Sequence, residues 1–144
     1  MIAVFDPASL AAKWFSRGQS DLRGARYYLS LAAPDDFENS CSHSQQAAEK
    51  ALKGFLVLHS VFFQKTHDLD ELCKLCEGCG PSFAAIRSEC KALTTYKGAR
   101  YPDYPDVNES EAEAALQKAE KIFAFCHSLF LSSPATAGQP TRPE

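Results

Sequence analysis

Residues 44–56, "SQQAAEKALKGFL", carry the strongest pattern in this chain of 144 residues. Ala48, Ala51 and Phe55 recur at helical spacing, which predicts a helix with one face in a core. A second face carries three polar side chains at steps of four and three residues: Gln46, Lys50 and Lys53. On pattern alone this is a solvated face with a Glu49–Lys53 pair, so a function for it depends on the surrounding sequence.

Two long helices are predicted from the N-terminal part of the chain. Asp6 followed by proline is an N-cap signal, and apolar residues then recur at helical steps over residues 8–32. Pro34 ends this first helix. Asp35, with a glutamate three residues later, resembles a capping box and predicts the start of a second helix. The second helix contains the quoted stretch and extends to about residue 59.

Three more helices are predicted beyond that point. A short third helix begins at the Asp68 cap and ends at the glycine-rich break of residues 78–81. A fourth spans residues 82–96, and Asn108 caps a fifth whose apolar stripe extends to Leu129. No alternation typical of strands is found. We therefore expect an all-α fold, an antiparallel up-and-down bundle of about five helices, three long and two short.

The chain divides into one domain and a tail. Its length suits a single domain with a real core, which we place at residues 1–131. Residues 132–144, "SSPATAGQPTRPE", lack large apolar groups and are rich in proline, serine, threonine and glycine. We expect this segment to be a disordered tail.

Composition excludes several classes of function. The net charge of −3 gives no overall attraction to nucleic acid or to an anionic membrane. The longest apolar run is far shorter than the roughly 18 residues of a membrane span. The N-terminus, "MIAVFDPASL", lacks the basic start and apolar stretch of a secretory signal. We therefore expect a cytoplasmic protein without membrane contact.

The cysteine-rich segment 73–79, "CKLCEGC", has the C-x2-C-x2-C spacing found in some iron–sulfur and zinc proteins. A ferredoxin run would continue to a cysteine where this chain has Phe83, and no second Cys/His pair follows at zinc spacing. We therefore expect no metal, and buried thiols on one side of a short helix at Cys73 and Cys76. A metal held by these two thiols and Cys79 is the open alternative.

Four motifs in order make the chain similar to the HEPN domain (higher eukaryotes and prokaryotes nucleotide-binding). They are "DL..A..YL", "QQAAEKALKGFL", "HDLDEL" and "RYPD", the last before a final long helix, and together they cover about residues 8–130. The resemblance implies an antiparallel helical bundle that commonly dimerises. Prokaryotic HEPN proteins are often encoded beside a minimal nucleotidyltransferase, as a two-component or toxin–antitoxin pair. Many others are metal-independent ribonucleases with an R-x4–6-H motif near the last helix.

The ribonuclease motif is missing from this sequence. No arginine is followed by histidine at the required distance; after Arg100 the corresponding positions hold Pro105, Asp106 and Val107. In these nucleases the arginine stabilises phosphate charge while the histidine handles a proton or orients the ribose hydroxyl. The resemblance therefore implies the non-nuclease branch, with no catalytic residues. A ribonuclease toxin with a non-standard site is the alternative.

Nucleotide binding would need cations for phosphates and aromatic faces for bases. The second helix and the loop at residues 97–106, "KGARYPDYPD", supply both, and His67 lies near the N-terminus of the third helix. We expect them to share one groove, with ATP or GTP as a possible ligand and no other cofactor. The candidate nucleotide-binding residues are Gln46, Lys50, Lys53, His67, Lys97, Arg100, Tyr101 and Asp103.

Some of these candidates also have a purely structural alternative. The His67 ring could bond a backbone carbonyl at a turn, and Arg100 could pair with Asp103 or Glu49. The whole chain could be a helical dimerisation domain without a ligand. The partners we expect are a nucleotide, a second copy of the chain and a nucleotidyltransferase, whereas RNA and DNA stay open but are not expected.

Overall fold

A computed structural model of the protein describes residues 6–136, apart from the side chain of Pro81. This part of the chain forms five α-helices and three 3₁₀ helices and contains no strand. The α-helices are α1 (Pro7–Leu31), α2 (Pro34–Leu58), α3 (Leu69–Glu77), α4 (Arg87–Leu93) and α5 (Glu109–Leu131). The 3₁₀ helices are η1 (Pro81–Ile86), η2 (Thr94–Tyr96) and η3 (Pro134–Thr136). The prediction of an all-α bundle with three long and two short helices is confirmed.

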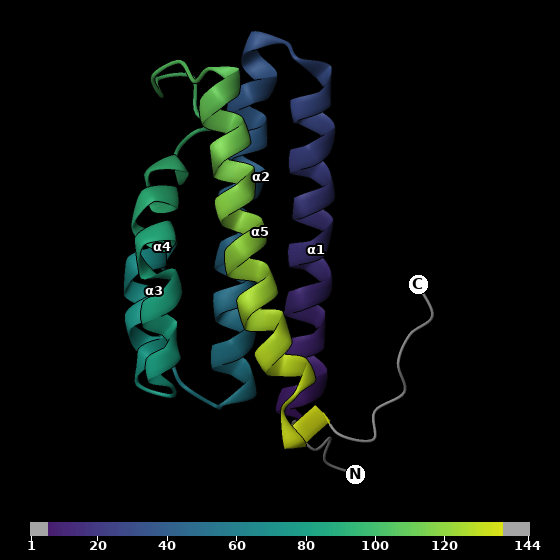
Figure 1. The fold of residues 1–144 in the computed structure, drawn as a ribbon, viewed down its shortest axis with the longest axis vertical. Helices are drawn as coiled ribbons and strands as arrows, with labels where there is room; N and C mark the ends of the chain where they lie inside the picture. Colours follow the sequence, from purple (N-terminus) through teal and green to yellow (C-terminus); the bar gives the residue numbers. More distant parts are fainter. Residues whose placement is uncertain (1–5, 137–144) are drawn as a thin grey trace.

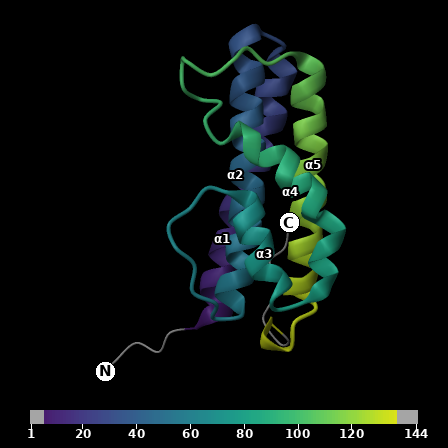
Figure 2. The same ribbon diagram turned by 90° about the vertical axis from the view of Figure 1, so that its left-hand side faces the viewer.

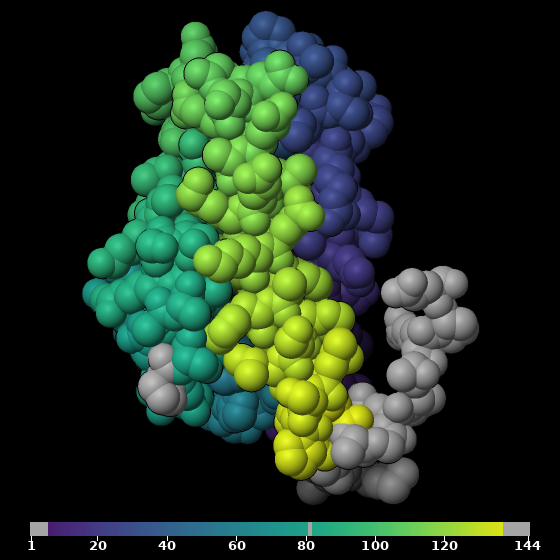
Figure 3. All heavy atoms as spheres, in the orientation of Figure 1, coloured from purple at the N-terminus to yellow at the C-terminus, as the bar shows by residue number. Residues whose placement is uncertain are grey.

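The three long helices lie side by side along the long axis of the molecule, and α3 and α4 cover one side of them (Figure 1). The view turned by 90° shows the short helices in front of α2 and α5 (Figure 2). On the face seen in Figure 3, the side chains of α5 fill the seam between α1 and the α3–α4 layer. Helix α2 contacts α1, α3, α4 and α5, so the stretch at residues 44–56 lies on the central helix.

Helix starts follow the predicted caps at three of four places. The Asp6 side chain accepts from the Ala8 N–H, Asp68 accepts from two N–H groups of α3, and Asn108 accepts from the Glu111 N–H. The capping box at Asp35 is wrong. Helix α2 begins at Pro34, whose fixed φ suits a first helical position and whose nitrogen needs no acceptor.

The Glu38 carboxylate of that predicted box has a different partner. Its Oε1 accepts from the Val107 N–H at 3.2 Å, which ties the start of α2 to the loop before α5. The predicted fourth helix also differs, because only Arg87–Leu93 is α-helical and η1 and η2 extend it at either end. Such tighter turns are common at helix ends.

Five of the six cysteines are buried in the core. Cys73 and Cys76 are fully buried, as predicted, and their thiols donate to the carbonyls of Phe83 and Leu52, each at 3.7 Å. Burial raises the pKa of the Cys76 thiol far above its usual range. Cys79 is exposed, and no three His, Cys, Asp or Glu side chains within residues 6–136 are grouped to hold a metal.

Helices α1 and α2 pack closely at Gly54. A Cβ atom there would lie 3.0 Å from the Phe15 ring and 3.1 Å from the Trp14 Cβ. The missing side chain thus lets the two helices meet along the quoted stretch. Among the described helices, none has both the length and the apolar character needed to cross a membrane.

Candidate functional site

A polar groove of about 200 Å³ forms where three segments of the chain meet on the surface. One wall comes from the polar face of α2, a second from the residue before the α3 cap, and a third from the loop after η2. The lining residues are Gln45, Gln46, Glu49, Lys50, His67, Lys97 and Arg100. We refer to these seven residues as the cationic groove, because three of them carry a permanent positive charge.

Five of the eight candidate residues therefore meet in one place. They are Gln46, Lys50, His67, Lys97 and Arg100. Lys53 is buried and does not line the groove, Tyr101 lines a neighbouring pocket, and Asp103 is exposed and lines neither. Sequence reasoning missed Gln45 and Glu49, which lie in the same helical run. Gln45 and Glu49 differ from the other polar residues of this run because they are buried and contact His67. Helical periodicity alone does not reveal these contacts.

Glu49 is the structural centre of the groove. Its side chain is only 10% exposed, and both carboxylate oxygens have partners. Lys53 Nζ donates to Oε2 at 2.9 Å, and His67 Nδ1 lies 2.9 Å from Oε1. Because a carboxylate can only accept, the Nδ1–H donates and the Nε2 atom is left without the ring proton when His67 is neutral.

His67 is held through its backbone as well as its ring. The buried Gln45 amide donates from Nε2 to the His67 carbonyl at 2.9 Å. The His67 ring bonds a carboxylate and not the backbone carbonyl of the structural alternative, and its side chain is 63% exposed. Its position at the groove is therefore fixed from two sides while much of the ring stays accessible.

Lys53 is buried next to the groove, and its ammonium lies near two aromatic rings. Its ammonium is 5.9 Å from the Trp14 ring centroid and 5.7 Å from that of Phe63, within the range of cation–π attraction. Phe63 belongs to the connection between α2 and α3, which folds back over this side chain. Lys53 is therefore a buried ion-pair partner of Glu49.

Lys50 is partly neutralised by an acidic partner on α1. Its Nζ donates to Asp21 Oδ2, and the other oxygen of Asp21 lies 3.1 Å from His43 Nδ1. Burial raises the pKa of the Asp21 carboxyl, but the hydrogen bonds from His43 and Lys50 outweigh it and lower the pKa overall. Lys50 therefore brings less free charge to the groove than its position suggests.

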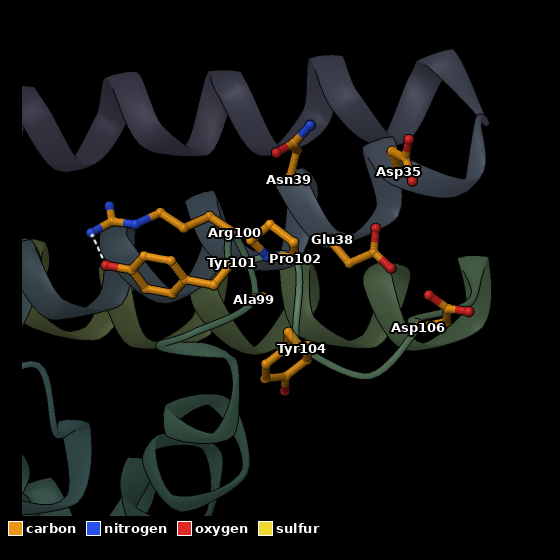
Figure 4. Close-up of a pocket in the computed structure, with 9 residues that line it drawn as sticks. All are labelled: Asp35, Glu38, Asn39, Ala99, Arg100, Tyr101, Pro102, Tyr104 and Asp106. Carbon is orange, nitrogen blue, oxygen red and sulfur yellow. Dashed lines mark hydrogen bonds between the residues drawn. The ribbon is translucent and has the colours of Figure 1, made fainter.

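Lys97 and Arg100 supply free charge. Neither forms an ion pair with any residue in the described part of the chain, so the predicted alternative pairs of Arg100 with Asp103 or Glu49 are absent there. The Arg100 guanidinium instead donates to the Tyr101 hydroxyl at 3.3 Å and lies over that ring (Figure 4). This contact braces the side chain and leaves its charge available.

The loop that carries Lys97 and Arg100 contains hydrogen-bonded turns and packs through Tyr104. Tyr104 is partly buried and its hydroxyl donates to the Thr95 carbonyl at 2.7 Å. Burial raises the pKa of the Tyr104 hydroxyl. Successive turns place the N–H groups of Ala99 and Tyr101 on carbonyls three residues earlier. Hydrogen bonds and turns therefore hold the loop at residues 97–106 in a defined conformation against the bundle.

A second pocket of about 350 Å³ adjoins the groove and shares Arg100 with it (Figure 4). We call it the acidic pocket. It is lined by Asp35, Glu38, Asn39, Ala99, Arg100, Tyr101, Pro102, Tyr104 and Asp106.

The histidine on the last helix has a structural environment. The ring of His127 lies 5.3 Å from those of Phe15 and Phe123, and it stacks on Phe130. Burial lowers the pKa of His127, which favours the neutral ring. It lines neither the groove nor the pocket.

Comparison with solved structures shows the same architecture in two other proteins. The crystal structure of TT1696 from Thermus thermophilus is similar with a TM-score of 0.67 and 29% identity, covering 82% of this chain and 96% of that one. ST0689, described as an archaeal HEPN homologue, is similar with a TM-score of 0.65 and 26% identity, covering 83% and 97%. The fold of this chain is therefore the helical-bundle fold of these two proteins.

The family follows from the sequence itself. The HEPN domain model matches residues 11–129, which is most of the chain. The chain therefore belongs to the HEPN domain family. No curated protein matches it.

Proposed function

We propose that this HEPN protein binds a nucleotide in the cationic groove and has no catalytic activity of its own. One observation carries the proposal: Lys97 and Arg100, which form no ion pair within residues 6–136, converge with Lys50 on one groove. Unpaired cations that meet in a concave site favour a multiply charged anion. A phosphate group fits because arginine offers a planar fork of donors and lysine a mobile point charge.

The polar neighbours of these cations suit a phosphate ester. Gln46 donates from Nε2 to Ser42 Oγ at 3.0 Å, which leaves the amide oxygen for a ligand donor such as a ribose hydroxyl. The braced Arg100 loses little freedom on binding, because its side chain already lies against Tyr101. ATP and GTP are the first ligands to test.

Lys97→Ala and Arg100→Ala should each weaken binding of ATP or GTP by about tenfold to a hundredfold, since each removes a hydrogen bond to a charged group. Isothermal titration and the ligand-induced rise in melting temperature measure the effect. Lys91→Ala is the matched control, because Lys91 is exposed and lines neither pocket. Equal losses in all three variants, or no binding by the unmodified protein, would overturn the proposal.

We further propose that the chain is a cytoplasmic homodimer that partners a minimal nucleotidyltransferase, in a two-component or toxin–antitoxin pair. Membership of the HEPN family supports this, and the partner would use the nucleotide that the groove holds. Co-elution with a nucleotidyltransferase encoded by the neighbouring gene is the expected observation. Elution of the two proteins as separate species would contradict it.

A ribonuclease is the second candidate, and the Glu49–His67 pair favours it. Glu49 holds the His67 Nδ1–H, so the neutral ring has an unprotonated Nε2, and Arg100 lines the same groove. Nε2 could take the proton of a ribose 2′-hydroxyl while Arg100 stabilises the charge on the phosphate. The 2′-oxygen would then attack the phosphorus and expel the 5′-oxygen, which takes up a proton, leaving a 2′,3′-cyclic phosphate.

Labelled RNA distinguishes the two candidates. Cleavage that persists in the presence of a chelator and is lost in both His67→Ala and Arg100→Ala would establish the ribonuclease and exclude the non-catalytic proposal. RNA that stays intact while nucleotide binds would exclude the ribonuclease.

A further inference from the structure

The acidic pocket presents carboxylates that the fold leaves largely unused. Figure 4 shows Asp35, Glu38 and Asp106 gathered on one side of the pocket, with the Arg100 guanidinium pointing away from them. Within the described residues, no lysine or arginine pairs with any of these carboxylates. Glu38 accepts one backbone hydrogen bond through Oε1, so its second oxygen is open.

A structural explanation covers only part of this arrangement. Asp35 lies in the first turn of α2, where a negative charge is favourable to the helix dipole. Asp106 lies in the loop two residues before Asn108, the N-cap of α5, and its carboxylate makes no ion pair with a described residue. Three carboxylates thus line one cavity of about 350 Å³, and a group rich in N–H donors would complement them.

Arg100 connects this pocket to the cationic groove. It lines both, and its guanidinium points away from the carboxylates (Figure 4). A ligand that spans Arg100 would therefore place an anionic group at one end and a donor-rich group at the other. A nucleotide has this polarity when its phosphate occupies the groove and its base enters the pocket.

We propose that the acidic pocket holds the base of the bound nucleotide and selects guanine, with Glu38 and Asp106 as the residues that recognise it. This inference rests on the proposed nucleotide-binding function. Guanine carries two adjacent donors on its pairing edge, N1–H and the exocyclic amino group, which match the two oxygens of a carboxylate. The amide of Asn39, in the same lining, can donate to the neighbouring O6 atom.

The other bases fit this pocket less well. Adenine offers one amino donor beside the acceptor N1, which a carboxylate repels. Uracil has one N–H between two carbonyl acceptors, and cytosine has one amino donor beside two acceptors. Hypoxanthine is the sharpest comparison, because it keeps N1–H and O6 but lacks the amino group of guanine.

The test is a titration of the full chain with GMP, IMP and AMP, which carry the same phosphate. GMP should bind at least about tenfold more tightly than IMP, as expected for one lost hydrogen bond to a charged group, and AMP should bind no better than IMP. Asp106→Asn combined with Glu38→Gln should bring the GMP-to-IMP ratio close to one. The glutamine retains an acceptor for the Val107 N–H, and a thermal melt checks the fold.

Asp103→Asn is the control, because it removes a carboxylate from the same loop that lines neither pocket. The inference is overturned if GMP, IMP and AMP bind equally, or if the double variant keeps the preference for GMP. In that case a loss of binding in Lys97→Ala would still support the proposed function. If neither the three nucleotides nor ATP and GTP bind, both the inference and the proposed function are wrong.

Discussion

Replacing Glu49 by alanine should lower the free energy of unfolding by about 3–5 kcal/mol, as for other buried ion pairs that lose one partner. The variant leaves the ammonium of Lys53 without its carboxylate in a site where that side chain is only 7% exposed. It also removes the ring partner of His67 at the groove. Urea denaturation followed by circular dichroism measures the loss.

Two further variants decide whether the buried charge is the cause. Glu120→Ala removes a pair with Arg26 whose side chains are 45% and 51% exposed, and it should cost less than about 1 kcal/mol. Changing Glu49 to leucine and Lys53 to methionine together should recover much of the loss, because apolar groups of similar volume can replace a buried pair. If Glu49→Ala and Glu120→Ala lower the free energy of unfolding equally, the Glu49–Lys53 pair contributes no more to stability than an exposed pair.

Phe83→Ala should destabilise the protein by a similar amount, about 3–5 kcal/mol. Phe83 is fully buried, and its ring lies 4.6 Å from that of Phe55 on α2 and 5.0 Å from that of Phe125 on α5. It therefore anchors the α3–α4 layer to both long helices through a single side chain. The short η1 turn that carries it has little stability of its own.

Hydrogen exchange adds a local measurement to the melting curve. The amides of α3 and α4 should lose protection first in Phe83→Ala, because their contact with the long helices is weakened. Phe62→Ala is the control, since that ring is 84% exposed and its loss should change stability by no more than about 0.5 kcal/mol. Equal effects of the two changes would contradict the role of Phe83 as an anchor.

Much of the fold could be predicted because local signals and tertiary structure agree. Asp68 and Asn108 combine a capping side chain with an apolar stripe that begins directly after it, and both helices start there. The pattern at Asp35 was misleading because Pro34 already provides a start one residue earlier. The α-helix predicted over residues 82–96 proved shorter, since periodicity does not distinguish the last turns of an α-helix from 3₁₀ turns.

The groove was only partly predictable for a different reason. Gln46 and Lys50 share a helix face with Lys53, and spacing places all three toward the same side. The connection after α2 then covers Lys53 with Phe63, a contact that no periodic pattern encodes. Glu49 was expected in a solvated pair, but the same connection brings His67 onto its second oxygen. Which cations stay free depends on these long-range contacts.

The two-residue link between α1 and α2 has a consequence for the order of folding. Helices joined by so short a connection meet with little loss of chain entropy, whereas α5 can dock only after residues 59–108 have been closed into a loop. We therefore expect the N-terminal hairpin to pair first during synthesis, before α5 docks. Until α5 emerges, the parts of α1 and α2 that it contacts in the folded bundle stay exposed to solvent.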